Sequence, residues 1–113
     1  MTLPQQTFSD VQPIALPSRF RPTCRIQQLV ALSFGIDPRC MKIRSTDEEH
    51  AWPRQVAMYL TRELTDHSLQ RIGASFNRHH TTVLHAIRAV EQRMRSDRFA
   101  RLDVAALRKA LER

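Results

Sequence analysis

One short stretch of the chain gathers most of the side chains that could recognise another molecule. It offers hydrogen-bond donors, acceptors and methyl groups in succession, from Asn77, Arg78, His79, His80, Thr81 and Thr82. Threonine can contact the methyl group of thymine and bond a phosphate, while histidine and arginine can donate to the acceptors on purine edges. If a helix begins here, its free backbone N–H groups also attract phosphate. The stretch therefore favours binding to duplex DNA; the alternative is a plain helical hairpin in which these residues only cap a helix.

The histidines also raise a zinc site and acid–base catalysis as alternatives. His80 and His85 lie five residues apart, and His79 and His85 lie six apart, so neither pair has the spacing of two ligands on one helical face. A catalytic histidine needs an orienting carboxylate in a pocket, and the adjacent Asp66 and His67 are more typical of a capped turn. We therefore expect no metal, no cofactor and no enzyme activity.

The polar stretch lies where two helices are expected to meet. Ser68 can cap a short helix over Leu69–Ser75, and Asn77-Arg78 is typical of a tight turn before a long helix over His79–Arg95. Apolar residues at helical spacing predict a buried stripe on the long helix: Val83, Ile87, Val90 and Met94. A short helix, a tight turn and a long helix form the helix-turn-helix layout, in which the polar start of the second helix enters the major groove.

The rest of the chain predicts further helices and no strands, since glycine is scarce and β-branched runs are absent. These elements are Pro22–Phe34, a single turn at Pro38–Met41, Ala51–Leu64 and Arg98–Leu111. Pro53 is tolerated only in a first turn, which places the start of its helix within a few residues. The spacing in the last helix points inward the side chains of Phe99, Leu102, Ala106 and Leu107. The predicted fold class is an all-α helix-turn-helix bundle of five or six helices.

The charge of the chain is consistent with a polyanionic partner. The chain carries 18 Lys and Arg against 11 Asp and Glu, a net charge of +7, and all basic residues except Lys42 and Lys109 are arginine. Arginine matches phosphate oxygens and guanine edges in pairs. A basic protein without such a partner, or a codon bias toward arginine, would show the same composition.

A chain of 113 residues fits one domain. Residues 1–20 contain Pro4, Pro13 and Pro17 without hydrophobic periodicity, which predicts a flexible arm before a domain over residues 21–113. No apolar run approaches the roughly 18 residues of a membrane span, and the N-terminus has no signal-peptide pattern. Cys24 and Cys40 lack metal-type spacing, which favours a reducing compartment. We expect a cytoplasmic protein associated with the nucleoid.

Two motifs carry a resemblance to a known family. The stretch His80–Ala86, with the sequence HTTVLHA, resembles the most diagnostic motif of the C-terminal DNA-binding domain of the bacterial replication initiator DnaA. Pro53–Leu60, followed by Glu63–Leu69 and Ile72-Gly73, resembles an earlier part of the same domain. The likeness covers residues 21–95 and implies an all-α bundle whose fold is like that of the Trp repressor. It also implies binding to short DnaA-box duplexes, which members of the DnaA family recognise.

The resemblance implies roles for individual residues. His80 and Thr81 would contact bases, and Thr82 a phosphate, near the start of the recognition helix. Arg54 and Gln55, at the start of an earlier helix, would lie on or near the DNA backbone. The implied partners are duplex DNA with DnaA-box-like sites and a full-length initiator, with which this chain would compete for such sites.

The turn of this chain departs from the family pattern. The family turn usually reads Gly-Gly-Arg-Asp-His, whereas the stretch Asn77–His80 is one residue shorter. Arg78 matches the basic residue of that turn, and His79 replaces the acidic base-contacting residue. A carboxylate accepts from the amino group of cytosine, whereas neutral histidine offers one donor and one acceptor, so the family's base preference does not carry over at this step.

The loop over residues 42–49 departs from the family as well. It holds the acidic run Asp47, Glu48 and Glu49, which phosphates repel, where the family has a basic residue that reaches the minor groove. Arg44 could take that role if the loop bends differently. No G-x-x-x-x-G-K-[ST] loop is present, so nothing in the sequence predicts ATP binding. The acidic run favours an alternative function, that of a protein-interaction regulator that keeps the fold without specific DNA reading.

Overall fold

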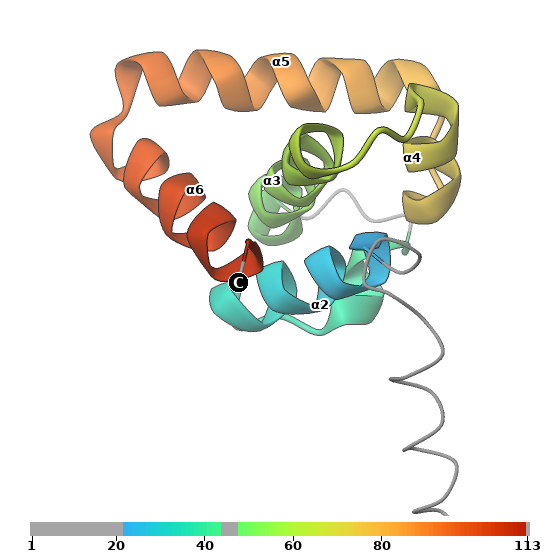
Figure 1. The fold of residues 1–113 in the computed structure, drawn as a ribbon, viewed down its shortest axis with the longest axis horizontal. Helices are drawn as coiled ribbons and strands as arrows, with labels where there is room; N and C mark the ends of the chain where they lie inside the picture. The colour runs from blue at the N-terminus through green and yellow to red at the C-terminus, as the bar shows by residue number, and fades with distance from the viewer. Residues whose placement is uncertain (1–21, 44–47, 113) are drawn as a thin grey trace, which may run out of the picture.

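The computed structural model describes residues 22–43 and 48–112, which form a bundle of helices (Figure 1). In chain order these are α2 (Pro22–Phe34), the 3-10 helix η2 (Pro38–Met41), α3 (Glu48–Leu64), α4 (Leu69–Phe76), α5 (His80–Ser96) and α6 (Arg98–Leu111). No strand occurs in this part of the chain, and the all-α prediction is confirmed. The arm predicted over residues 1–20 lies outside the described residues, as does Arg44.

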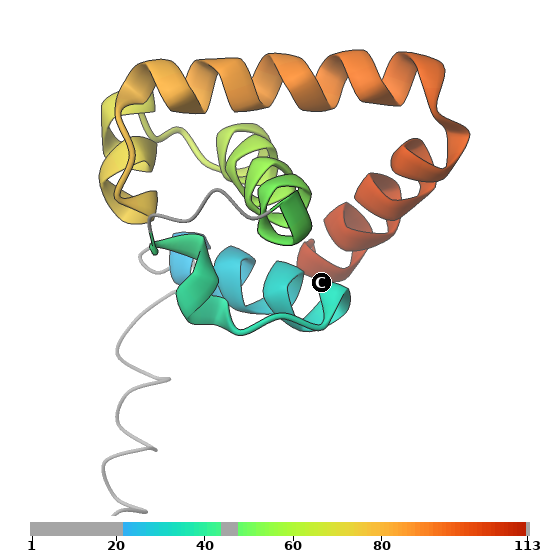
Figure 2. The ribbon, with the colours of Figure 1, turned by 180° about the vertical axis from the view of Figure 1, so that it is seen from behind.

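Helix α3 lies at the centre of the bundle (Figure 1 and Figure 2). α5 runs along one side of it and α2 along the opposite side, while α4 and α6 lie toward the two ends of α5. Because both sides of α3 are covered, its middle turns are completely buried, as Val56, Ala57 and Leu60 show. Val30 of α2 and Phe76 of α4 belong to the same core, together with residues of α5 and α6. Burial of apolar surface, worth about 25 cal/mol per Å², makes α3 the element around which the others are held.

α3 begins three residues before its predicted start, at Glu48 rather than Ala51, so the predicted start is wrong. Pro53 consequently lies inside the helix, beyond its first turn. A proline at this position removes one intrahelical hydrogen bond, and its ring crowds the carbonyl four residues earlier. Pro53 itself is buried and Trp52 packs against the core, and this burial holds the segment helical despite the lost bond. Glu48 and Glu49, predicted in a loop, therefore belong to the first turn of α3.

α6 buries a different face from the one predicted. The residues that face the core are Ala100, Val104, Leu107 and Leu111. Among the four residues predicted to point inward only Leu107 does so, whereas Phe99 is 74% exposed, Leu102 is 57% exposed and Ala106 is also exposed. The sequence contains two apolar stripes at helical spacing. The buried stripe begins with the small Ala100, which lets α6 pack close to the end of α5.

The long helix α5 is fixed to the core along its whole length. Val83 and Val90 are completely buried and Ile87 nearly so, which confirms the first three residues of the predicted stripe, while Met94 is half-buried against the core. On the flank of the helix, the Arg93 guanidinium carbon lies 4.2 Å from the centre of the Trp52 ring. This cation–π contact joins α5 to α3. α5 is therefore a rigid element whose first turn is positioned by packing further along it.

Candidate nucleic-acid interface

The first helix of the helix-turn-helix, α4, is short and capped at both ends. The Ser68 hydroxyl accepts a hydrogen bond from the backbone N–H of Arg71 at 3.1 Å, which satisfies one of the free donors of the first turn. At the other end Asn77 adopts the left-handed conformation, with φ 56° and ψ 46°, and ends the helix. Ile72 and Phe76 are completely buried. α4 is therefore fixed to the core at a defined length, one residue longer than predicted.

α4 and the turn after it approach each other more closely than a side chain would allow. A Cβ atom on Gly73 would lie 2.5 Å from the backbone oxygen of Arg78 and 3.4 Å from backbone atoms of His79 and His80. The backbone N–H of Arg78 donates to the carbonyl of Gly73 at 2.8 Å. The missing side chain of Gly73 thus determines how α4 crosses the start of α5.

Two side chains of the turn are bonded to the segment after η2. The Asn77 amide donates to the carbonyl of Lys42 at 3.4 Å, and Nη2 of Arg78 donates to the carbonyl of Ile43 at 2.7 Å. Nη1 of Arg78 also donates to the carbonyls of Phe76 and Asn77, at 3.0 Å and 3.2 Å. The Arg78 guanidinium is therefore engaged by protein carbonyls and holds the turn against the residue that precedes Arg44.

His79 is the N-cap of α5, so the helix begins one residue later than predicted. Its Nδ1 atom accepts a hydrogen bond from the backbone N–H of Thr81 at 3.2 Å and lies 2.9 Å from the Thr81 hydroxyl. Its ring also lies against that of His80, with 4.2 Å between the ring centres. These contacts fix the His79 side chain at the very start of the helix.

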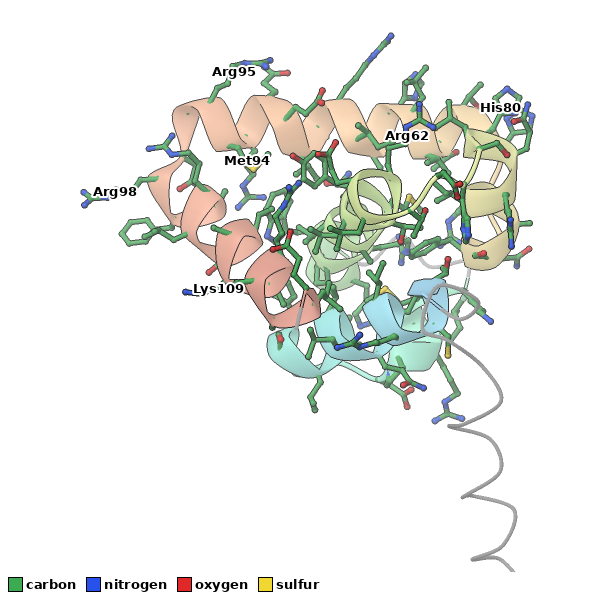
Figure 3. All side chains as sticks on the ribbon, viewed as in Figure 1. Arg62, His80, Met94, Arg95, Arg98 and Lys109 are labelled. Atoms are coloured by element: carbon green, nitrogen blue, oxygen red, sulfur yellow. The ribbon has the colours of Figure 1, made fainter. Side chains whose placement is uncertain are left out.

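The first turn of α5 presents polar groups on its outer side. His79, Thr81 and Thr82 are exposed and His80 is half-buried, whereas the next residue, Val83, is completely buried. Figure 3 places His80 at the end of α5 nearest α4, and Arg95 at the opposite end. The residues that the sequence singles out therefore project from one end of a helix whose inner side is core.

Arg54 lies in α3 with its charged group in an unusual setting. The residue is 9% exposed, and its Nε and Nη2 atoms are buried without a hydrogen-bond partner. Burial lowers the pKa of the guanidinium from its ordinary value, and Cys40 has a smaller opposite effect. Arginine stays charged at neutral pH, and a buried cation with unfilled donors favours a bound anion. Gln55, the next residue, is half-buried.

Two residues that position this site were not singled out as functional from the sequence. Gln27 of α2 is buried, and its amide donates to the carbonyl of Ser75 at 2.9 Å, which ties α4 to α2. Gly73 determines the approach of α4 to the turn. A glycine inside an amphipathic helix is unfavourable without a packing reason, so the scarcity of glycine was a signal that could have indicated Gly73.

Neither a metal-binding cluster nor a membrane-spanning helix occurs among the residues that the structure describes. Residues 22–43 and 48–112 contain no group of three or more His, Cys, Asp or Glu side chains placed to hold a metal ion. One pair comes close, since Sγ of Cys40 lies 3.7 Å from Nε2 of His50. Two ligands fall short of the four of a structural zinc site. No helix within these ranges has the length and apolar character to cross a membrane.

The sequence that forms α2 to α5 matches a known family. A family model described as "Bacterial dnaA protein helix-turn-helix" covers residues 24–90, which run from α2 into the recognition helix. The chain belongs to this DnaA family. The family assignment accounts for the shared motifs on α3 and α5, and it confirms the resemblance drawn from them.

Individual DnaA proteins show how far the similarity reaches. The chromosomal replication initiator protein DnaA of Symbiobacterium thermophilum is 40% identical over 93 residues, which cover 81% of this chain and 20% of that protein. The DnaA protein of Desulfatibacillum aliphaticivorans is 44% identical over 72 residues, or 64% of this chain and 16% of that protein. This chain therefore spans about a fifth or less of the DnaA proteins it matches.

A solved structure shows the same fold. The crystal structure of a DNA replication initiation factor superposes with a TM-score of 0.74 at 28% identity, over 83% of this chain and 29% of that one. The DnaA helix-turn-helix fold is therefore retained here.

Proposed function

We propose that this chain binds duplex DNA at DnaA-box-like sites, with the first turn of α5 in the major groove, and that it does so in the regulation of replication initiation. The observation that carries the proposal is the division of α5: polar residues on its exposed first turn and core residues behind them. Membership of the DnaA helix-turn-helix family supports DNA binding by this surface. The DNA-bound form would compete with a full-length initiator for the same sites.

The geometry suits this role in two ways. The start of α5 carries the positive end of the helix dipole, which attracts phosphate. Exposed Thr81 and Thr82 supply methyl and hydroxyl groups at the same end, suited to a thymine methyl and a phosphate. His80 lies beside them in the same turn. Arg78 contributes by ordering the turn, and Arg44 is proposed to reach the minor groove.

Base contacts by the first turn of α5 can be tested at Thr81. Thr81→Ala should cost on the order of 1–3 kcal/mol on a DnaA-box duplex and less on scrambled DNA, because a base contact discriminates between sequences. Titrations with both duplexes, at two salt concentrations, measure this difference. Gln92→Ala, an exposed position on the same helix, is the matched control. Equal losses on both duplexes, in a variant that stays folded, would contradict base reading by α5.

The proposed phosphate contact is carried by Arg54. Its two unpartnered nitrogens are buried, so a phosphate would reach them only when the residues that cover them shift, and it would then supply the acceptor that they lack. Arg54→Ala should weaken binding to all sequences alike and flatten the plot of log K against log salt by about 0.9. Arg62→Ala, an exposed arginine near the other end of α3, is the control. An unchanged slope would remove Arg54 from the interface.

The exposed side chains of α6 favour a second candidate function, in which the chain regulates a protein partner. Phe99 and Leu102 lie three residues apart on one face of α6, and large exposed apolar groups often mark protein contacts. They lie near the end of α5 farthest from His80, in the region where Figure 3 shows Met94 and Arg98. If regulation of a protein partner is the principal function, the parent chain should bind DnaA-box and scrambled duplexes equally. A gel-shift with the two duplexes decides between the two candidate functions.

A further inference from the structure

The N-cap of the recognition helix also determines which hydrogen-bonding group it offers to DNA. Nδ1 of His79 receives the backbone N–H of Thr81 at 3.2 Å, and a backbone N–H can only donate. Nδ1 must therefore carry a lone pair rather than a proton. The Thr81 hydroxyl, 2.9 Å from the same atom, can donate to that lone pair as well. Only the neutral ring with its proton on Nε2 satisfies both contacts.

We infer that His79 presents its Nε2–H group as a hydrogen-bond donor to the major groove, and so selects a base with an acceptor edge. The inference rests on the proposed function, because it concerns the same DNA-binding surface. The major-groove acceptors are N7 and O6 of guanine, N7 of adenine and O4 of thymine, whereas cytosine presents only an amino donor there. His79 should favour guanine, which offers two acceptors, and disfavour cytosine in the same strand position.

Neighbouring groups keep the ring in this orientation. The His79 ring lies against that of His80 at 4.2 Å, with the two planes inclined by 34°. His79 is exposed, so its ring can meet a partner outside the protein. Its cap contacts hold Nδ1 toward the helix and thereby direct the opposite edge of the ring outward. The Thr81 hydroxyl is drawn into the same cap, which leaves its methyl group as the part available to a thymine.

A carboxylate at this position would reverse the polarity. Aspartate is a good N-cap, so His79→Asp should keep α5 capped while replacing an outward donor by an acceptor. The variant should lose the guanine preference and gain a preference for cytosine at one and the same position of the site. A swap between donor and acceptor at a single well-placed base contact corresponds to about a tenfold change in relative affinity.

The experiment measures the affinity of the parent and His79→Asp for a DnaA-box duplex in which each base pair is changed in turn to the other three. Gln92→Glu, which adds the same charge to α5 about 20 Å away, controls for electrostatic repulsion and should change no base preference. In parallel, ¹⁵N shifts of the His79 ring in the free protein, at about pH 8, report which nitrogen carries the proton. We expect the His79 ring of the parent to carry its proton on Nε2. We also expect the base preference of His79→Asp to be reversed at one position of the site.

The outcomes separate this inference from the proposed function. If the parent prefers the DnaA box over scrambled DNA but His79→Asp alters no base preference, the inference is wrong and the proposed function stands. A proton found on Nδ1 would likewise overturn the inference alone. If the parent shows no preference for the box at all, both fail.

Discussion

Replacing Gly73 by alanine tests whether the close approach of α4 to the turn is needed for the fold of the interface. The new Cβ would lie 2.5 Å from the backbone oxygen of Arg78, against an ordinary contact of 3.4–4 Å. The obstacle is backbone, which cannot rotate away as a side chain can, so the turn must move by at least about 0.9 Å. Overpacking of this kind costs up to about 3 kcal/mol. Alanine recovers about 1 kcal/mol through its better helix propensity.

The net expectation for Gly73→Ala is a loss of about 2 kcal/mol, or roughly 8–16 °C in Tm for a domain of this size. Because the displaced turn leads directly into His79 and His80, we also expect a loss of about tenfold in the preference for a DnaA-box duplex over scrambled DNA. Thermal melts followed by circular dichroism, and titrations with both duplexes below the lower Tm, provide the two measurements.

Gly35 supplies the matched control for this prediction. It has φ +72°, and a Cβ there would meet nothing within 4 Å, so Gly35→Ala strains the backbone without any clash. That strain costs about 1–2 kcal/mol, and the site is remote from the recognition helix, so stability should fall while the DNA preference is kept. A Gly73→Ala variant with unchanged or raised Tm and an unchanged preference would refute the reasoning, since helix propensity would then have outweighed the contact.

Three further changes probe the parts that hold the interface. Ile87→Ala should lower the free energy of unfolding by roughly 2–5 kcal/mol through the cavity it leaves, and a loss below about 1 kcal/mol in urea denaturation would show that the stripe on α5 is loosely packed. Asn77→Gly should raise stability by up to about 1 kcal/mol because glycine adopts the left-handed conformation freely; a lower Tm would mean that the bond from the Asn77 amide to Lys42 is worth more than the strain. Hydrogen bonds from Arg39 lower the pKa of Asp37 from 3.8 to about 2, so the stability it contributes is complete above about pH 4 and is lost as the pH falls through 2. Asp37→Asn should remove that part of the acid dependence, and melting curves of parent and variant that stay parallel from pH 7 to pH 2 would contradict it.

The helix-turn-helix was the part of the fold most accessible from the sequence. α5 follows the predicted stripe of Val83, Ile87 and Val90, and its bounds differ by one residue at each end. Ser68 caps α4 as expected, because a serine followed by helical periodicity is a local signal that needs no knowledge of the rest of the chain. Local patterns were sufficient to predict a cap or a helix boundary where these depend only on residues of the same helix.

Features that depend on contacts between distant segments were not accessible in this way. The face of α6 could not be chosen from spacing, because Phe99 and Leu102 fit helical periodicity as well as the buried Ala100 and Val104 do. The start of α3 was missed because the burial around Pro53 outweighs its local helix-breaking effect. The same holds for the site, since the unpartnered nitrogens of Arg54 appear only once the surrounding elements have buried them.

The double use of His79 as a cap and as a donor restricts how this protein can change its target. At positions 81 and 82 the side chains are exposed, so substitutions there can alter base or phosphate contacts with little effect on the core. Position 79 is different, because whatever residue stands there must also cap α5. Its choices narrow to residues that can accept a hydrogen bond from the first turn, chiefly Ser, Thr, Asp and Asn besides histidine. Among these, an exchange between histidine and aspartate would reverse the polarity shown to DNA while keeping α5 capped, so a single substitution at this residue could change the binding site.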